Sequence, residues 1–184
     1  MATVRTIAEV AGQELVWVQP SRMQQAFELH AAGELVATLR FERGSLAAAE
    51  TAGDRWTFKR EGFWRPQVTV RLPSSDTNLA VFKPSWTGGG TLELSSGQVF
   101  RFGAANFWHS QWDWQDTESE SLLQFKSHAG ILKMEGQVEV EPGAHGLTEL
   151  PLLVALGWYL LILFARDAAA ASAGSTAAIT STGS

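Results

Sequence analysis

The basic side chains between positions 55 and 71 are the residues whose types and spacing most readily suggest chemistry. This segment sets five basic residues against one acid, Glu61, in a chain whose net charge is -5. The basic residues are Arg55, Lys59, Arg60, Arg65 and Arg71. Guanidinium and ammonium groups bind phosphate and carboxylate oxygens through charge-assisted hydrogen bonds. The segment is therefore the candidate site for an anion or a phospholipid headgroup, and the alternative is a solvated outer face whose charges are paired.

Two paired strands are needed to position these side chains. The alternation of apolar and polar residues predicts strands at Arg55–Arg60 and Pro66–Leu72, joined by a turn centred near Phe63. In that register Arg55 lies on the outer face opposite Arg71. Like charges directly opposite each other weaken a sheet, so acids from a neighbouring strand or an anionic ligand would have to lie between them.

A run of acids offers a second possible chemistry, calcium binding. The run consists of Asp113, Asp116, Glu118 and Glu120. Calcium takes six to eight oxygen ligands, and its loops usually contain a glycine for a sharp turn. The spacing does not match such a loop, and Trp112 and Trp114 alternate with the acids as in a strand. A polar hairpin turn at Asp116–Ser119 is the better interpretation.

The other reactive residue types form no recognisable constellation. The histidines stand singly, at His30, His109, His128 and His145. The absence of cysteine excludes disulfides, thiolate zinc sites and cysteine nucleophiles. No serine lies in a nucleophile elbow, and Gly88–Gly90 lacks the Lys-Ser/Thr ending of a phosphate loop, which favours a turn. We predict no catalytic residue, metal or cofactor; the alternative is an enzyme that uses scattered polar residues in a barrel mouth.

Composition sets the class of protein. The chain has 184 residues, of which 45% are hydrophobic and 18% charged, which indicates one globular domain. Eight Trp and ten Phe accompany a single Tyr. Core packing is the default for such rings, and a ligand cleft is the alternative for four of them, Trp86, Trp108, Trp112 and Trp114. The pI near 5.4 argues against a nucleic-acid partner.

Short alternating runs separated by turn residues occupy most of the chain and predict about twelve strands, as in a sandwich or barrel. They are Glu14–Gln19, Gln25–His30, Glu34–Phe41, Ser45–Thr51, Arg55–Arg60, Pro66–Leu72, Asn78–Pro84, Thr91–Leu94, Gln98–Phe102, Gln111–Gln115, Ser121–Ser127 and Ile131–Glu141. The Ala-rich run Ser45–Thr51 would also suit a helical turn.

The segment Leu150–Ala165 has a different pattern, apolar on every side. Thr148 suits an N-cap, and Pro151 falls in the first turn of the predicted helix. Sixteen residues span roughly 24 Å, whereas a hydrocarbon core needs roughly 30 Å. Arg166 and Asp167 then end the run. We predict a helix buried in protein; the alternative is a tail anchor in a membrane.

The strands and the helix together predict the fold class: a mainly β protein with a closed antiparallel barrel around a buried hydrophobic C-terminal helix. Eight strands fill a barrel with their own side chains, whereas about twelve leave a lumen. A helix of about 10 Å diameter suits that lumen. The predicted divisions are an N-terminal segment at 1–13, a barrel domain at 14–167 with its central helix at 148–166, and a disordered Ala/Ser/Thr/Gly tail at 168–184.

This order of many strands and then one apolar helix resembles the tubby C-terminal-like superfamily, which includes LURP-one-related proteins and phospholipid scramblases. The stretches that carry the likeness are Arg55–Arg71, Phe82–Leu92, Asn106–Trp112 and Glu149–Leu161. The resemblance implies a twelve-stranded barrel around a central helix. It also implies a non-catalytic binding or regulatory module whose partner is an anionic phospholipid or a protein.

The resemblance does not supply a membrane tether. Scramblases carry cysteines for acylation and a proline-rich extension, whereas this chain has no Cys and six Pro. The first ten residues contain no continuous apolar stretch of the kind found in a secretory signal. We therefore expect a cytoplasmic protein with peripheral membrane contact, and a scramblase-like tail anchor at 150–165 is the alternative.

Overall fold

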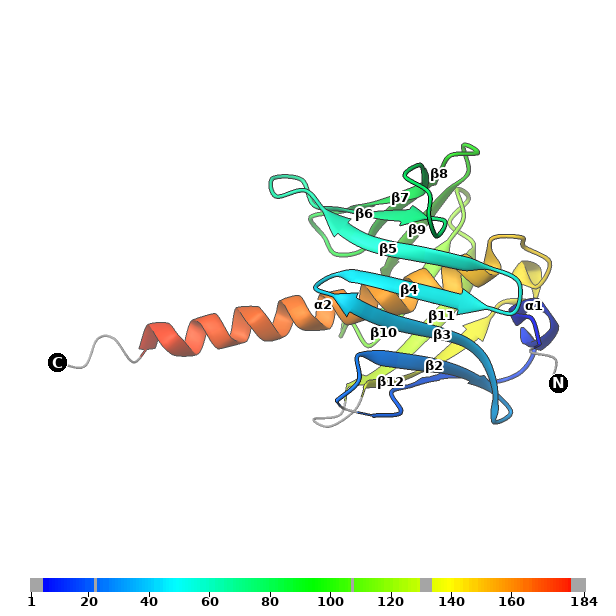
Figure 1. The fold of residues 1–184 in the computed structure, drawn as a ribbon, viewed down its shortest axis with the longest axis horizontal. Helices are drawn as coiled ribbons and strands as arrows, with labels where there is room; N and C mark the ends of the chain where they lie inside the picture. The colour runs from blue at the N-terminus through cyan, green and yellow to red at the C-terminus, as the bar shows by residue number, and fades with distance from the viewer. Residues whose placement is uncertain (1–4, 22, 107, 130–133, 180–184) are drawn as a thin grey trace.

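The computed structural model shows a closed β-barrel threaded by one long helix (Figure 1). It describes residues 5–21, 23–106, 108–129 and 134–179. The strands are β1 Leu15–Val18, β2 Ala26–Ala31, β3 Glu34–Arg43, β4 Leu46–Thr51, β5 Arg55–Glu61, β6 Gln67–Arg71, β7 Asn78–Pro84, β8 Gly90–Leu94, β9 Val99–Ala104, β10 Gln111–Gln115, β11 Ser121–Ala129 and β12 Met134–Val140. The helices are α1 Ile7–Val10, the 3-10 helix η1 Pro142–Ala144 and α2 Leu150–Ile179.

The barrel is a meander in which each strand pairs antiparallel with its sequence neighbours, and β1 closes the ring against β12. The predicted barrel of about twelve strands is therefore confirmed. The Ala-rich run that would also have suited a helical turn is strand β4. Residues 131–133, the predicted start of the last strand, lie outside the described residues.

The core lies inside the barrel because inward side chains alternate along each strand. On β5, Trp56 and Phe58 are buried; on β6, Val68 and Val70 are buried. Their inward direction matches the alternation in the sequence. Once a ring of this size closes, these side chains need an apolar partner at its centre.

Helix α2 provides that partner. Its first half is buried without interruption from Leu152 to Leu163, and its aromatic side chains pack on barrel rings. Trp158 stacks on Trp17 with 5.9 Å between ring centroids, and Tyr159 stacks on Phe41 at 5.4 Å. The prediction of a helix buried in protein is confirmed: α2 is long and apolar enough to cross a membrane, but 67% of its most apolar window is buried.

One glycine in α2 permits a close approach of the barrel wall. A Cβ at Gly157 would collide with the Phe125 ring and would lie 2.8 Å from Nε1 of Trp114. That indole N–H donates a buried hydrogen bond of 2.9 Å to the Leu153 carbonyl. The wall therefore packs directly on the helix backbone at this level.

The helix is longer than predicted. α2 continues to Ile179, so the prediction of a disordered tail from 168 is wrong for residues 168–179; residues 180–184 lie outside the described residues. The physical reason is that the buried half has already nucleated the helix. Alanine, which dominates the following stretch, then propagates it most readily. Figure 1 shows this second half projecting from the barrel.

The N-terminal segment also contains an element that the sequence prediction missed. Thr6 and Glu9 form a capping box: the Glu9 carboxylate accepts from the Thr6 backbone N–H at 2.7 Å, and Thr6 Oγ1 accepts from the Glu9 N–H at 3.3 Å. This one-turn helix buries Ile7 and Val10 in the core. The Thr-x-x-Glu spacing was the available signal.

Because the strands alternate in direction, the turns divide between two ends of the barrel. The end from which α2 leaves, called here the exit end, carries the turns at 19–25, 44–45, 62–66, 85–89 and 105–110. The opposite end, called the α1 end, carries the turns at 32–33, 52–54, 72–77, 95–98 and 116–120. Figure 1 shows α1 at one end and the projecting part of α2 at the other.

Candidate functional site

Four of the five predicted site residues make ion pairs within the protein. Arg55 contacts Glu50 at 3.5 Å, Lys59 contacts Glu61 at 3.3 Å, Arg71 contacts Glu61 at 3.4 Å, and Arg60 contacts Asp167 at 2.7 Å. Arg71 also donates to the Asn78 side chain at 2.7 Å. The structure therefore does not assemble the five residues into one anion site. Arg65 alone among them has no acidic partner within the described part of the chain.

The register explains why the expected repulsion is missing. On β5 and β6, Thr57 pairs with Arg71, so the register is two residues away from the prediction, and Arg55 is not opposite Arg71. A shift of two residues keeps every side chain on its predicted face. The turn is centred one residue later, at Trp64. Arg55 instead lies opposite Glu50 of β4.

Charged residues form a collar where α2 leaves the barrel. Arg166 lies over the Phe41 ring at 3.9 Å and donates to the Gly44 carbonyl and the Gln25 side chain. Asp167 accepts from Arg60 of the neighbouring strand β5 at 2.7 Å. The two residues that end the apolar run therefore bind the barrel rim separately, and they fix the direction in which the helix leaves.

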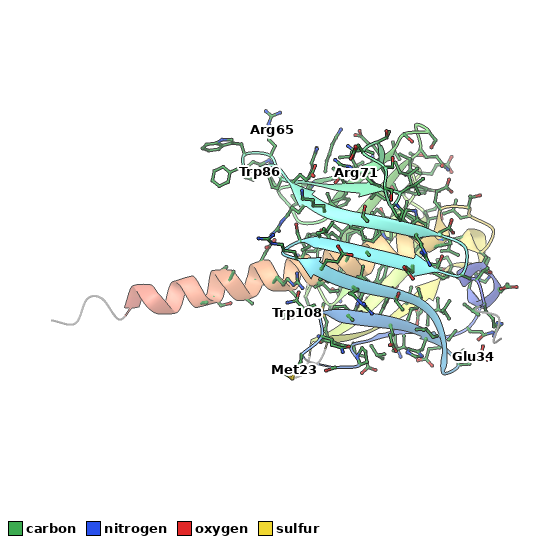
Figure 2. All side chains as sticks on the ribbon, in the orientation of Figure 1. Met23, Glu34, Arg65, Arg71, Trp86 and Trp108 are labelled. Carbon is green, nitrogen blue, oxygen red and sulfur yellow. The ribbon has the colours of Figure 1, made fainter. Side chains whose placement is uncertain are left out.

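The exit end also holds the most exposed large apolar side chains of the described chain. Five such side chains are more than four-fifths exposed: Met23 96%, Phe63 88%, Trp64 90%, Trp86 106% and Trp108 81%. All five lie on exit-end turns. Figure 2 shows Met23, Trp86 and Trp108 on the side of the barrel from which α2 projects, and Glu34 at the opposite end. The exposed rings thus surround the base of the projecting helix.

The loop that carries Trp108 is built from specific hydrogen bonds. Oδ1 of Asn106 accepts from the backbone N–H groups of Ser110 and Gln111, at 3.1 and 3.3 Å. The indole N–H of Trp112 donates to the His109 carbonyl at 3.0 Å. His109 adopts a positive φ of 54°. The loop is therefore closed on itself in a conformation that leaves the Trp108 side chain outside.

The turn that carries Trp86 is similarly fixed. Ser85 and Gly89 are joined by a backbone hydrogen bond of 3.0 Å, and Ser85 Oγ donates to the Gly88 carbonyl at 2.9 Å. A Cβ at Gly89 would collide with the Phe102 backbone. The glycine run therefore forms the turn that the sequence predicted. It seats that turn tightly against β9 and places Trp86 at its tip.

The two ends of the barrel also differ in charge. The described exit-end turns contain no acid and one basic residue, Arg65. The α1-end turns contain no basic residue and the five acids Asp54, Asp76, Asp116, Glu118 and Glu120. One of them, Asp116, caps the predicted hairpin turn, where its Oδ1 accepts from the N–H groups of Glu118 and Glu120 at 2.9 Å each. The molecule thus has an acidic end and an end rich in aromatic residues.

Sequence reasoning treated four tryptophans alike, and the structure separates them. Trp112 and Trp114 are buried on β10, as the default predicts, whereas Trp86 and Trp108 lie on turns and are exposed. A signal was present in the neighbours. Trp86 stands between Ser85 and the glycine run, and Phe63 and Trp64 stand between a glycine and a proline, where an aromatic ring has no strand to place it inside.

Within the described residues there is no group of three His, Cys, Asp or Glu side chains that could hold a metal ion. Comparison of the chain with protein-family models, with curated proteins and with solved structures finds no match. The resemblance to the tubby C-terminal-like superfamily therefore stays a prediction, and the barrel fold by itself does not indicate a function.

Proposed function

We propose that this protein is a non-catalytic membrane-binding module that docks end-on, with its exit end in the headgroup region of a lipid bilayer. The observation that carries the proposal is the gathering of the five most exposed large apolar side chains on exit-end turns. Two of the four turns that carry them, those of Trp86 and Trp108, are held by internal hydrogen bonds, so the fold itself presents these rings to solvent.

Physical chemistry favours lipid as the occupant of this end. Trp and other aromatic rings concentrate at membrane–water interfaces. Each ring can bury about 150–250 Å², which at about 25 cal/mol per Å² is worth several kcal/mol. The lack of acids on the described exit-end turns suits an anionic lipid surface, which would repel the acidic α1 end. Peripheral contact of this kind is compatible with the expected cytoplasmic location.

The alternatives fit the geometry less well. A tail anchor at 150–165 would have to draw Leu152–Leu163 out of the barrel that they fill. The emptied lumen would then expose the inward rings of the strands. An enzyme site in the barrel mouth would compete with the same helix, because α2 occupies the lumen and Arg166 and Asp167 bind the rim.

Flotation of the full chain with lipid vesicles tests the proposal. We expect the wild type to float with zwitterionic vesicles and more strongly with vesicles that contain anionic lipid. The triple variant Phe63→Ser, Trp64→Ser, Trp86→Ser should lose most of this binding. Its far-UV circular dichroism should not change, because the three rings are exposed.

The matched control is Leu35→Ser with Leu72→Ser, which removes exposed apolar side chains from the α1 end. This variant should bind vesicles like the wild type. Equal flotation of the triple variant and the wild type would refute the proposal, as would a wild type that binds neither kind of vesicle.

The orientation has its own measurement, because the chain has no cysteine. A polarity-sensitive dye on Thr87→Cys, next to Trp86, should shift to the blue when vesicles are added. The same dye on Ser96→Cys, at the α1 end, should not respond. A response at Ser96 equal to that at Thr87 would contradict end-on docking.

A further inference from the structure

We infer that the groove between the β5–β6 and β7–β8 turns binds the phosphate of an anionic phospholipid headgroup through Arg65. The inference rests on the proposed end-on docking and adds a specific site to it. The groove has a volume of about 820 Å³, and its lining includes Trp64, Arg65, Lys83 and Trp86. Figure 2 shows Arg65 and Trp86 at the same corner of the exit end.

Arg65 is the cation of this groove that is left for a ligand. The other cation in the lining, Lys83, is held by Glu93 at 2.6 Å. The remaining predicted site residues are paired with acids, as described above. Arg65 has no acidic partner within the described residues, although its planar guanidinium offers five donors. Its charge is therefore not neutralised inside the protein.

The neighbouring rings set the depth in the bilayer at which the Arg65 side chain lies. Trp64 and Trp86 are both nearly fully exposed and line the same groove. Indole rings settle at the level of the lipid headgroups. An arginine that lines the same groove as two such rings then lies beside the phosphate layer. It can keep its charged group there while its carbon stem contacts apolar material.

The ligand chemistry follows from the side chain. A guanidinium binds a phosphate through two parallel N–H···O hydrogen bonds, which a lysine ammonium cannot reproduce. Interactions of this kind strengthen when the rings around them exclude water. The chemical class of the ligand is thus the phosphate of an anionic lipid headgroup, whose negative charge is not offset by an ammonium group in the same lipid. A free phosphate ion would not be held at the level of the two rings by the bilayer.

Vesicle binding by four full-length proteins tests the inference: wild type, Arg65→Gln, Arg65→Lys and Arg43→Gln. Arg43 is the matched control, an exposed arginine where β3 reaches the exit end, outside the groove. On vesicles containing anionic lipid, Arg65→Gln should lose about fivefold in affinity. Arg65→Lys should lose part of this, and Arg43→Gln should lose less than Arg65→Gln. On zwitterionic vesicles the affinities of the four proteins should differ less from one another than they do on anionic vesicles.

Equal losses for Arg65→Gln and Arg43→Gln, together with wild-type binding by Arg65→Lys, would show unspecific charge attraction and overturn the inference. Docking on zwitterionic vesicles would then still stand, so failure of the groove and failure of the proposed function are distinguishable. The source of the phosphate is tested by the NMR signal of the Arg65 Nε–H group. It should shift with anionic vesicles and not with inorganic phosphate alone. An equal shift with inorganic phosphate would replace the lipid ligand with a free anion.

Discussion

The two halves of helix α2 are both helical, but a different physical effect stabilises the helix in each half. From Leu152 to Leu163 every residue is buried by the barrel, and a Cβ added at Gly157 would collide with the Phe125 ring. From Asp167 to Gly174 every residue is exposed. The first half is helical because the barrel packs around it. The second half is helical because alanine continues a helix that is already nucleated.

The stability of the barrel therefore depends on the buried half of α2. A substitution in the buried half acts on the whole barrel, whereas the same substitution in the projecting half acts on local helicity alone. Arg166 and Asp167 mark the boundary, because both bind the barrel rim.

The largest effect is expected from a charge in the buried half. Leu156→Asp should lower the free energy of unfolding by at least about 3–5 kcal/mol, the cost of an unpaired buried charge, which is a large part of a domain stability of about 5–15 kcal/mol. Leu156 is 0% exposed. Thermal unfolding measures the loss, and Ala170→Asp in the exposed half is the control that should melt like the wild type. Equal melting of both variants would mean that the barrel does not depend on its helix.

A smaller loss is expected at Gly157. Alanine improves helix propensity by about 1 kcal/mol, but its Cβ would collide with Phe125 and crowd Trp114. Overpacking costs about 1–3 kcal/mol, so Gly157→Ala should lower the free energy of unfolding in a denaturant titration. A more stable variant would show that the wall is not in contact with the helix backbone.

Tyr159 gives a prediction about pH. Its hydroxyl donates to the Ser45 carbonyl at 2.7 Å, and burial raises its pKa above the ordinary value. The folded state therefore keeps this proton at pH values where the unfolded state, with a tyrosine pKa of about 10, releases it. The contribution to stability is complete below about pH 10 and falls by about 1.4 kcal/mol per pH unit above it.

Tyr159→Phe supplies the comparison, because the chain has a single tyrosine. The variant should lose about 0.5–1.5 kcal/mol at neutral pH through the missing hydrogen bond. Its stability should fall less steeply than that of the wild type above pH ~10. In the wild type, tyrosinate absorbance should appear only with unfolding. Titration of the folded protein at the ordinary pKa would contradict the buried position of the hydroxyl.

The smallest effect is expected at the second glycine of the helix. No heavy atom lies within 4 Å of a Cβ placed at Gly174. Gly174→Ala should therefore raise local helicity through a propensity gain of up to about 1 kcal/mol and leave the global melting temperature unchanged. Amide hydrogen exchange of the projecting half detects this gain. Alanine should therefore be destabilising at Gly157 and stabilising at Gly174. Effects of the same sign at both positions would show that the two halves of α2 do not differ in packing.

Much of the fold could be predicted because its patterns are periodic. Alternation placed Trp56 and Phe58 inside, and the apolar run beginning at Leu150 predicted a helix buried in the core. The projecting half could not be predicted, since its Ala/Ser/Gly composition is shared by helices and low-complexity tails. Its helical structure depends on the buried half of α2, which nucleates it, and the composition of the tail carries no information about that.

The candidate site was predicted less well, for a different physical reason. Basic side chains bind whatever acid is nearest, and the sequence does not show that Glu61 reaches both Lys59 and Arg71. The two-residue error in register removed the expected clash between Arg55 and Arg71. To predict that the exposed aromatic rings gather in one place, one must know that all of their turns lie at one end of the barrel. That follows from the direction of the strands once the ring is closed.

The position of α2 in the chain has a consequence for how the protein is made. All twelve strands precede α2 in the chain. During synthesis the strands of the barrel are therefore made before the helix that occupies its lumen. Pairing of β1 with β12 joins distant parts of the chain, and such long-range contacts form slowly. Until α2 arrives, the inward Trp and Phe side chains have no partner. The nascent protein then exposes apolar surface and is prone to aggregation, as are the intermediates on which chaperones act.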